Sequence, residues 1–413
     1  MDLPISRQRR CRLANGRLTT HMPRKLRVGI IFGGRSGEHE VSLRSAASVL
    51  AAIDKKKYDV VPIGITKAGQ WLLADEAQHM LAGGTTVTAT HLPKPRSTHQ
   101  SALVPTAHPG LLQVPASARE HGQAEALGVD VLFPVLHGTF GEDGTIQGLF
   151  ELAGKAYVGS GVLGSAAGMD KDIMKRLFAA AGLPIVEHIT LIRGAWQKSP
   201  RKAIADIEAN LRYPLFVKPA NLGSSVGISK VHDRSELAPA IVLAASYDRK
   251  IIVEQGVGGK GSKDKPGERA RELEVAVLGN DEPKASVVGE IVPAKEFYDY
   301  EAKYESDGSI PIIPARLSKA QSKEIREMAI AAFHACDCSG LARVDFLLEP
   351  ESRSGKPGRL YVNEINTMPG FTSISMYPKL WAASGLKYAD LIDRLIELAL
   401  ERRAEREDTQ YSR

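Results

Sequence analysis

The chain has little cysteine and no long apolar run. Only Cys11, Cys336 and Cys338 occur among 413 residues, and the last two form a CxC pair without a second pair at a zinc-binding spacing. Three cysteines cannot build a disulfide framework, so we interpret them as reduced thiols of a cytoplasmic protein. No apolar run approaches the roughly 20 residues that span a bilayer, so we predict no membrane partner.

Basic charge is concentrated at the N-terminus. The net charge is +6, but residues 1–21 hold five arginines and one acid, Asp2, which leaves only +2 for the remainder. A nearly neutral body lacks the basic stripe of a nucleic-acid-binding protein, so we predict no nucleic-acid partner. The basic segment has no apolar stretch of the secretory kind. We interpret residues 1–23 as a disordered extension with Met22 as the functional start, and a transit-like leader is the alternative.

The first part of the chain alternates strand and helix patterns. Strand patterns cover 26–32, 60–65 and 129–138, and helical patterns cover 41–53 and 145–154. This alternation, with Gly33 and Gly34 after the first strand, is typical of an α/β unit. Residues 75–125 have little periodicity, and we interpret them as a variable insertion rather than a core element.

Two further units follow. Asp170 is a predicted N-cap for a helix through Ala181, and Gly182 with Pro184 ends that helix. Strand patterns then cover 186–192, 213–219, 250–255, 271–279, 285–293, 340–349 and 359–367, and helical patterns cover 200–210, 318–335 and 388–402. Loops are expected at 258–270 and 293–314. The order predicts an α/β protein, α+β in its C-terminal half, with domains at 24–163, 164–254 and 255–405 and a tail at 406–413.

A glycine-serine loop lies within residues 217–230, VKPANLGSSVGISK. Successive backbone N–H groups of such a loop can bind phosphate, and Lys218 adds a positive charge. Ser224 and Ser225 add hydroxyl donors. The lysine precedes the glycines, unlike the order in a P-loop. A tight turn between two strands is the alternative interpretation.

Acidic and amide side chains occur on two successive strand patterns near the C-terminus. Asp345 lies in ARVDF, and Glu364 and Asn366 lie two positions apart in VNEIN, which places the latter pair on one strand face. Two carboxylates and an amide oxygen suit Mg²⁺. Acids on apolar strands are costly unless they are paired or bound to metal, so a salt bridge to Arg343 or Lys218 is the alternative. Together with the loop, this set predicts a Mg-ATP enzyme.

These motifs resemble a known family. KPANLGSSVGISKV at 218–231, RVDF at 343–346 and NEINTMPGFTSISMYP at 363–378 resemble the ATP-grasp ligases. The segments at 33–46, 136–151, 168–175 and 297–304 resemble, within that group, the D-alanine–D-alanine ligases. The resemblance runs from about residue 24 to 400. It implies a Rossmann-like preATP-grasp domain followed by a two-lobed ATP-grasp fold.

The resemblance also implies an ATP site and a metal site. The implied ATP-binding residues are Lys175, Lys218, Ser225 and Lys303 for the phosphates, Glu254 and Val257 for the adenine side, and Glu272 for the ribose. The sequence EQGV at 254–257 departs from the Lys-Trp pair common in relatives at 255–256, so backbone contacts are expected there. The implied metal ligands are Asp345, Glu364 and Asn366, which would hold two Mg²⁺ ions, with Mn²⁺ as a substitute.

The implied substrate residues form a second group. Glu38 would bind the ammonium of the first D-alanine, and Ser224 and Tyr304 would hydrogen-bond with Glu38 and close the loops. His137 would lie near the first substrate. Arg343 and the N–H of Gly370 would stabilise the oxyanion, as preorganised donors do, and Ser375 would bind the carboxylate of the second D-alanine. The segment 297–304 would form a lid that excludes water from an acyl phosphate.

Several single residues have simpler interpretations. Glu38 is placed to cap the helix that begins near Val41, because acids suit helix N-termini. His137, at a strand end, would otherwise be a surface histidine. Tyr298, Tyr300 and Tyr304 could pack beneath a loop. The apolar spacing of 388–402 is typical of plain core packing.

The implied function is ATP-dependent ligation of two D-alanine molecules through a D-alanyl phosphate, for peptidoglycan precursor synthesis. D-lactate or D-serine as second substrate is the alternative, and Tyr304 favours the dipeptide. A nucleotide-binding protein without catalysis is a further alternative, but it has no need for Lys218, Arg343, Asp345, Glu364 and Asn366 together. The resemblance implies a homodimer through the N-terminal domain.

Overall fold

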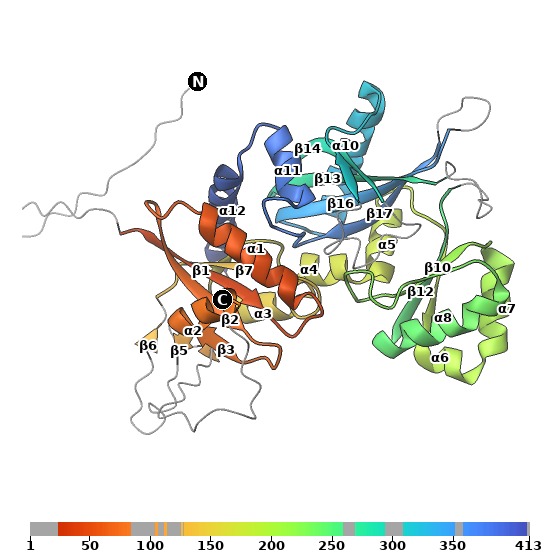
Figure 1. Cartoon of the computed structure of the whole chain (residues 1–413), viewed down its shortest axis with the longest axis horizontal. Helices are drawn as coiled ribbons and strands as arrows, with labels where there is room; N and C mark the ends of the chain where they lie inside the picture. Colours follow the sequence, from red (N-terminus) through yellow and green to blue (C-terminus); the bar gives the residue numbers. More distant parts are fainter. Residues whose placement is uncertain are drawn as a thin grey trace, which may run out of the picture.

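The computed structural model describes residues 24–83, 104–105, 111–113, 125–126, 128–258, 269–293, 309–351 and 358–410. Three lobes, each built on its own sheet, surround a common centre (Figure 1). Predicted residues Lys303 and Tyr304, with Tyr298 and Tyr300, lie outside the described residues. In the part of the chain described, no helix combines the length and the apolar character needed to cross a membrane.

The first lobe is a largely parallel sheet with strand order β3-β2-β1-β7-β8. Its strands are β1 (Leu26–Gly33), β2 (Tyr58–Ile65), β3 (Trp71–Leu73), β7 (Val131–Val135) and β8 (Ala156–Tyr157), and its helices are α1 (His39–Ala52), α2 (Ala74–Leu81), α3 (Thr145–Leu152) and α4 (Val162–Met169). Strands β1 and β7 are buried along their shared length, which explains their continuous apolar runs. Both strands end at the central cavity described below, where a parallel sheet commonly binds ligands.

The interpretation of residues 75–125 as an insertion without a core element is wrong at its start. Helix α2 packs on β2, and its residues Ala77 and Met80 are buried in the core of the first lobe. These two positions are one helical turn apart, which is too short a pattern to stand out in the sequence. Later in the same range, β4 (Val104–Pro105), β5 (Leu111–Gln113) and β6 (Glu125–Ala126) pair as a small separate sheet.

The central lobe is an antiparallel sheet with strand order β11-β10-β12-β9. Its elements are β9 (His188–Ile192), α6 (Arg193–Lys198), α7 (Pro200–Asn210), β10 (Leu215–Pro219), β11 (Ser229–Val231), α8 (Arg234–Tyr247) and β12 (Lys250–Gln255). Helix α5 (Lys171–Ala180) precedes the lobe, and Asp170 caps it as predicted by accepting from the N–H groups of Asp172 and Ile173. The sequence did not predict α8, which carries Pro239 in its first half and is capped by Asp233.

The third lobe is an antiparallel sheet with strand order β15-β14-β13-β16-β17. Its elements are β13 (Arg271–Gly279), β14 (Lys284–Val292), β15 (Ile310–Ile312), α10 (Lys319–Ala335), β16 (Gly340–Leu348), β17 (Leu360–Asn366), α11 (Met376–Ala383) and α12 (Tyr388–Glu407). Ser318 and Gln321 form a capping box at the start of α10. The predicted strands and helices of this lobe are confirmed within a few residues.

The last helix of the chain, α12, packs against the first lobe. Helix α12 lies against the first lobe beside α1, β7 and β8 (Figure 1), and its buried residues Leu391, Leu395 and Leu398 share one core with Val28 of β1. The predicted interpretation of 388–402 as a core-packing helix is confirmed. This contact holds the first and third lobes together around the central cavity.

Candidate active site

A cavity of about 1320 Å³ lies where the three lobes meet. The predicted site residues that line it are Glu38, His137, Lys218, Ser224, Ser225, Glu254, Val257, Glu272, Arg343, Asp345, Glu364, Asn366, Gly370 and Ser375. Lys175 does not line it, because this fully buried side chain lies behind Glu254. The fold therefore brings residues from positions 38 to 375 to one cavity.

The phosphate loop, residues 221–227, connects β10 to β11 and reaches the first lobe. Ser224 Oγ donates a hydrogen bond to Glu38 Oε1. Ser224 and Ser225 both adopt left-handed backbone, with φ of 53° and 58°, a conformation that costs energy in non-glycine residues and clusters at ligand-binding loops. Glu38 occupies the N-cap position of α1, but its side chain makes no capping hydrogen bond. The capping interpretation is thus wrong for the Glu38 side chain.

Two lysines and one glutamate form a buried ion cluster beside the loop. Glu254 Oε2 lies 2.6 Å from Lys218 Nζ, and Glu254 Oε1 lies 3.1 Å from Lys175 Nζ. Burial raises the pKa of Glu254, but the two lysines outweigh it and bring the pKa to about 2. In the part of the chain described, Lys175 Nζ makes no hydrogen bond besides this ion pair. The cluster therefore keeps two positive charges together with one negative charge, a surplus that suits phosphate.

The predicted metal residues lie together on β16 and β17. Asp345 and Glu364 are direct partners across these strands, and Arg343 is paired with Asn366. Arg343 Nε and Nη2 each donate to Asp345 at 2.7 Å, and Asn366 Nδ2 donates to the same carboxylate at 3.0 Å. The alternative predicted for Asp345, a salt bridge to Arg343, is thus present. Over the described ranges, no three His, Cys, Asp or Glu side chains form a group that could hold a metal ion.

His137 is buried and bridges the first and third lobes. Its Nδ1 lies 2.9 Å from the carbonyl oxygen of Met368, and its Nε2 lies 3.1 Å from Ser45 Oγ. A carbonyl only accepts, so Nδ1 carries the proton and Nε2 accepts from the serine hydroxyl. Burial lowers the pKa of His137, although the Glu38 charge opposes this, so the neutral imidazole is favoured. The interpretation of His137 as a surface histidine is wrong.

The segment 367–371, which we call the oxyanion loop, is held on both sides. The Phe371 N–H donates to Ser45 Oγ at 3.4 Å, and the Phe371 carbonyl accepts from Tyr388 Oη at 2.6 Å. The buried Phe371 ring packs against the rings of Phe133, Tyr377 and Tyr388. The peptide that follows Gly370 therefore has little freedom to move. Ser375 Oγ, one turn later, accepts from the N–H of Thr372 at 3.1 Å.

Comparison with known proteins assigns the chain to a family. Residues 27–160 match the model of the D-ala D-ala ligase N-terminus, and residues 177–397 match the model of the D-ala D-ala ligase C-terminus. The chain belongs to the D-alanine–D-alanine ligase family. The predicted family and the predicted ATP-grasp fold are confirmed, and ATP use follows from membership of the family.

Individual relatives cover almost the whole chain. A D-alanine--D-alanine ligase from Chloroherpeton thalassium is 50% identical over 382 residues, which are 92% of this chain and 98% of the relative. The structure of VanG D-Ala:D-Ser ligase from Enterococcus faecalis has a TM-score of 0.74 and 38% identity, and covers 91% of this chain and 100% of its own. The D-alanine-D-alanine ligase from Coxiella burnetii has a TM-score of 0.73 and 35% identity, and covers 93% of this chain and 96% of its own.

The D-alanine–D-alanine ligase fold also places two residues at the site that the sequence analysis missed. Lys171 Nζ donates to the carbonyl of Leu222 at 2.9 Å and so anchors the base of the phosphate loop. Glu142 lines the cavity and accepts from two backbone N–H groups, those of Gly138 and Met368. Glu142 lies within the segment 136–151 on which the resemblance rested, so this segment was the only signal that could have found it.

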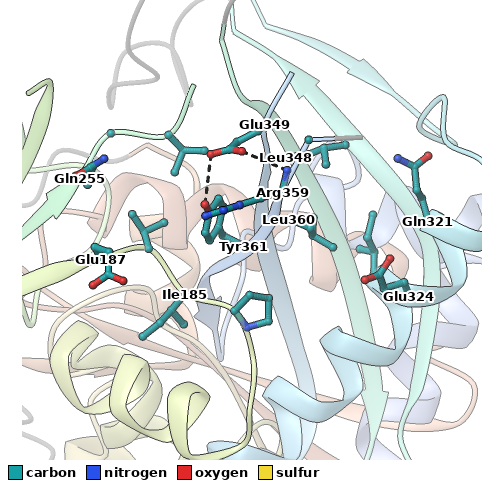
Figure 2. Close-up of a pocket in the computed structure, with 16 residues that line it drawn as sticks. Ile185, Glu187, Gln255, Gln321, Glu324, Leu348, Glu349, Arg359, Leu360 and Tyr361 are labelled. Atoms are coloured by element: carbon teal, nitrogen blue, oxygen red, sulfur yellow. Dashed lines mark hydrogen bonds between the residues drawn. The ribbon is translucent and has the colours of Figure 1, made fainter. Parts of the chain in front are cut away.

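A second cavity of about 750 Å³ is lined by residues 184–187 and 255–257 together with residues of α10, β16 and β17 (Figure 2). Ile185, Glu187, Gln255, Glu324 and Tyr361 are among its lining residues. Figure 2 shows Glu349 bonded to the Arg359 backbone and to Tyr361, both at 3.3 Å. The segment 255–257, where adenine contacts are predicted, lines both cavities.

Proposed function

We propose that this chain catalyses the reaction of its family, the ATP-dependent ligation of two D-alanine molecules to D-alanyl-D-alanine. The dipeptide would supply peptidoglycan precursor synthesis in a bacterial cytoplasm. The observation that supports the proposal is that one cavity is lined by Glu38, by the glycine-serine loop bonded to it through Ser224, and by the acids Asp345 and Glu364. These groups serve the two charged substrates that such a reaction must bring together.

The first step needs charge neutralisation more than covalent chemistry. A carboxylate is a poor acylating agent, so transfer of the γ-phosphoryl group of ATP converts the first D-alanine to an acyl phosphate. Lys218 and Lys175 would offset the phosphate charge, and Glu254 holds both lysines in place. Backbone N–H groups of the phosphate loop would contact the transferred group, as in other anion-binding loops. Glu272 and the backbone at 255–257 would bind the nucleoside.

Divalent cations would be held by Asp345, Glu364 and Asn366. The donor set fits Mg²⁺, because it offers carboxylate and amide oxygens from two adjacent strands facing the same cavity. The cations would neutralise the phosphate charge when bound, and we propose two Mg²⁺ ions with Mn²⁺ as a substitute. The Asp345 carboxylate would then contact both the cation and Arg343. Arg343 has a second acidic partner, because its Nε lies 3.2 Å from Glu274 Oε2.

The second step needs an oxyanion site and exclusion of water. The deprotonated amine of the second D-alanine would attack the carbonyl carbon of the acyl phosphate and form a tetrahedral oxyanion. Collapse of this intermediate would break the C–O bond to phosphate, release inorganic phosphate and a proton, and leave the peptide bond. Arg343 and the Gly370 N–H would stabilise this charge. Arg343 is held by Asp345, and the residue after Gly370 is held through the bond from the Phe371 N–H to Ser45. Ser375 would bind the second carboxylate, and Lys303 and Tyr304 would complete the closed site.

The test measures phosphate release from Mg-ATP with D-alanine alone and identifies the product by mass. D-alanyl-D-alanine from D-alanine alone, lost in Glu364→Ala, is the expected result. ATP binding without turnover under any substrate would overturn the proposal and favour a nucleotide-binding protein without catalysis.

A second candidate reaction uses D-serine as the second substrate. The observation that favours it is the similarity to VanG D-Ala:D-Ser ligase, which matches this chain over 91% of its length. The same assay distinguishes the two reactions, because a mixture of D-alanine and D-serine would yield mainly the mixed dipeptide. D-lactate in place of D-serine tests the depsipeptide reaction.

We also propose that the chain forms a homodimer through its N-terminal domain, residues 24–163, with ATP-grasp subdomains at 164–254 and 255–405. Large apolar side chains support the dimer, because Leu152 at the end of α3 and Leu163 at the start of α4 are 76% and 63% exposed on neighbouring helices. Sedimentation of the full chain tests it, and a monomer at micromolar concentration would contradict it.

A further inference from the structure

The Glu142 carboxylate connects two lobes. Its Oε2 accepts from the Gly138 N–H at 2.7 Å, within the loop that follows β7. Its Oε1 accepts from the Met368 N–H at 2.8 Å, within the oxyanion loop of the third lobe. The two accepting oxygens of one side chain therefore tie the first lobe to the third at the cavity.

Each end of this connection lies beside a proposed reaction group. Gly138 contacts Glu38 so closely that a Cβ atom on the glycine would lie 2.4 Å from Glu38 Oε2. Met368 lies two residues before Gly370, whose N–H is the proposed oxyanion donor. A shift of either N–H group would therefore move the ammonium site relative to the oxyanion site.

We propose that Glu142 is a positioning residue that couples the ammonium site at Glu38 to the oxyanion loop. The inference rests on the proposed roles of Glu38 and Gly370 and adds a residue that the motifs did not assign. In this role Glu142 acts through the N–H groups of Gly138 and Met368. Its carboxylate form suits the task, because both oxygens then accept, whereas a protonated carboxyl carries an O–H on one of them.

The charges around Glu142 link its ionisation to substrate binding. Glu38 before α1, Arg343 on β16 and His137 at the end of β7 are the titratable or charged groups that face it. Burial and the Glu38 charge raise the pKa of Glu142 to about 8, although the two N–H groups and Arg343 oppose the shift. The ammonium of a bound D-alanine would offset the Glu38 charge. Binding would therefore favour ionised Glu142 and tighten both hydrogen bonds.

The test compares Glu142→Gln with the wild type in steady-state kinetics across pH 6 to 9. The wild-type kcat/KM for D-alanine is expected to rise with pH up to about 8, because the ionised form is the competent one. In Glu142→Gln one N–H meets an amide NH₂, so kcat/KM falls about tenfold or more. The variant also loses the dependence on pH in this interval.

Glu151→Gln is the matched control. Glu151 is an acid of the same lobe, bonded to Tyr157 and Arg406 and absent from the cavity lining. Its variant is expected to retain wild-type kinetics. Glu142→Asp keeps the charge but shortens the side chain, so it is expected to retain the pH dependence at a reduced rate. Wild-type kinetics and an unchanged pH profile in Glu142→Gln would overturn the proposal.

Amide hydrogen exchange separates this inference from the proposed function. Loss of the carboxylate is expected to speed exchange at whichever of Gly138 and Met368 faces the amide NH₂ in Glu142→Gln, whether or not the enzyme turns over. Unchanged exchange at both positions would refute the connection even if the ligase activity is present. Faster exchange in a protein that fails to ligate D-alanine would leave the connection intact and overturn the proposed function instead.

Discussion

Ser224 donates a hydrogen bond to Glu38 across 186 positions of sequence. The bond joins the phosphate loop of the central lobe to the start of α1 in the first lobe. Gly138 and Gly223 both pack closely against the same carboxylate. A Cβ atom added to either glycine would lie within 3 Å of Glu38 Oε2. Glu38 is therefore held by the two segments that, in the proposed reaction, enclose ATP and the first substrate.

Loss of the Ser224 hydroxyl is expected to weaken closure of the phosphate loop. A hydrogen bond to a charged group contributes about 1.5–3 kcal/mol, so kcat/KM for D-alanine should fall roughly 10- to 100-fold in Ser224→Ala. Steady-state kinetics check this. Ser235→Ala is the control, because Ser235 bonds an exposed carboxylate at the start of α8 and its loss should leave kcat/KM unchanged. A Ser224→Ala enzyme with wild-type kinetics would show that the bond does not contribute to turnover.

The backbone of the phosphate loop requires glycine at position 227. Gly227 has φ of 71°, and a Cβ atom there would lie 2.6 Å from Tyr247 Cδ2 and 3.0 Å from Pro219 Cγ. Gly227→Ala should distort the loop at a cost of about 1–3 kcal/mol and raise the KM for ATP. Gly194→Ala in α6, where a Cβ atom meets nothing within 4 Å, is the control. The double variant with Tyr247→Ala should recover part of the loss, and no recovery would exclude the clash as its cause.

Removal of the Glu364 charge is expected to weaken the proposed binding of Mg²⁺ and so to lower the activity of the enzyme. Turnover of Glu364→Gln at low Mg²⁺ should fall at least about a hundredfold. This loss is larger than the loss expected from mutating a residue that only hydrogen-bonds to a metal ligand. Magnesium titration of phosphate release measures this loss. Glu349→Gln, at the second cavity near the end of β16, should leave the titration curve unchanged. Equal curves for wild type and Glu364→Gln would contradict the metal role.

Acid should destabilise the protein through Glu254. Its pKa is about 2 in the folded state and 4.5 in its ordinary range, so the unfolded state binds a proton first as pH falls. The stabilisation is present above pH 4.5 and is lost between pH 4.5 and about 2. Denaturant unfolding across this range should therefore show a smaller pH dependence in Glu254→Gln. Glu397→Gln, on the exposed face of α12, should keep the wild-type slope.

Arg402 is expected to hold the last helix against the first lobe. Its guanidinium donates to the carbonyls of Gly159 and Tyr157 and to Ser339 Oγ, and it lies 4.3 Å above the Tyr157 ring. Arg402→Ala leaves these buried acceptors without a donor and should lower the free energy of unfolding by at least about 2 kcal/mol. Arg394→Ala on the same helix removes only surface ion pairs and should cost at most about 1 kcal/mol. Similar losses in both variants would contradict the anchoring role.

Local patterns predicted most of the elements but missed those with weak local signals. Four strands of the third lobe, β13, β14, β16 and β17, have long apolar runs and were found within a few residues. The short strand β15 was missed, because it lies within residues 293–314, which were predicted to be a loop. Helix α8 was missed because Pro239, its sixth residue, lies beyond the first turn, where proline is normally a helix breaker. Helix α2 was missed because its buried face consists of little more than Ala77 and Met80.

The sequence by itself determined the family and the chemical type of the site. Its motifs are long, they occur in the family's order, and each is local, so no knowledge of the fold was needed to find Lys218, Asp345 or Glu364. Only the tertiary structure decided which groups face one another. Glu142 and Met368 are 226 positions apart, and Glu38 and Ser224 come from different lobes. A hydrogen bond needs atoms within about 3 Å, and packing of the three sheets, rather than any local pattern, brings these atoms together.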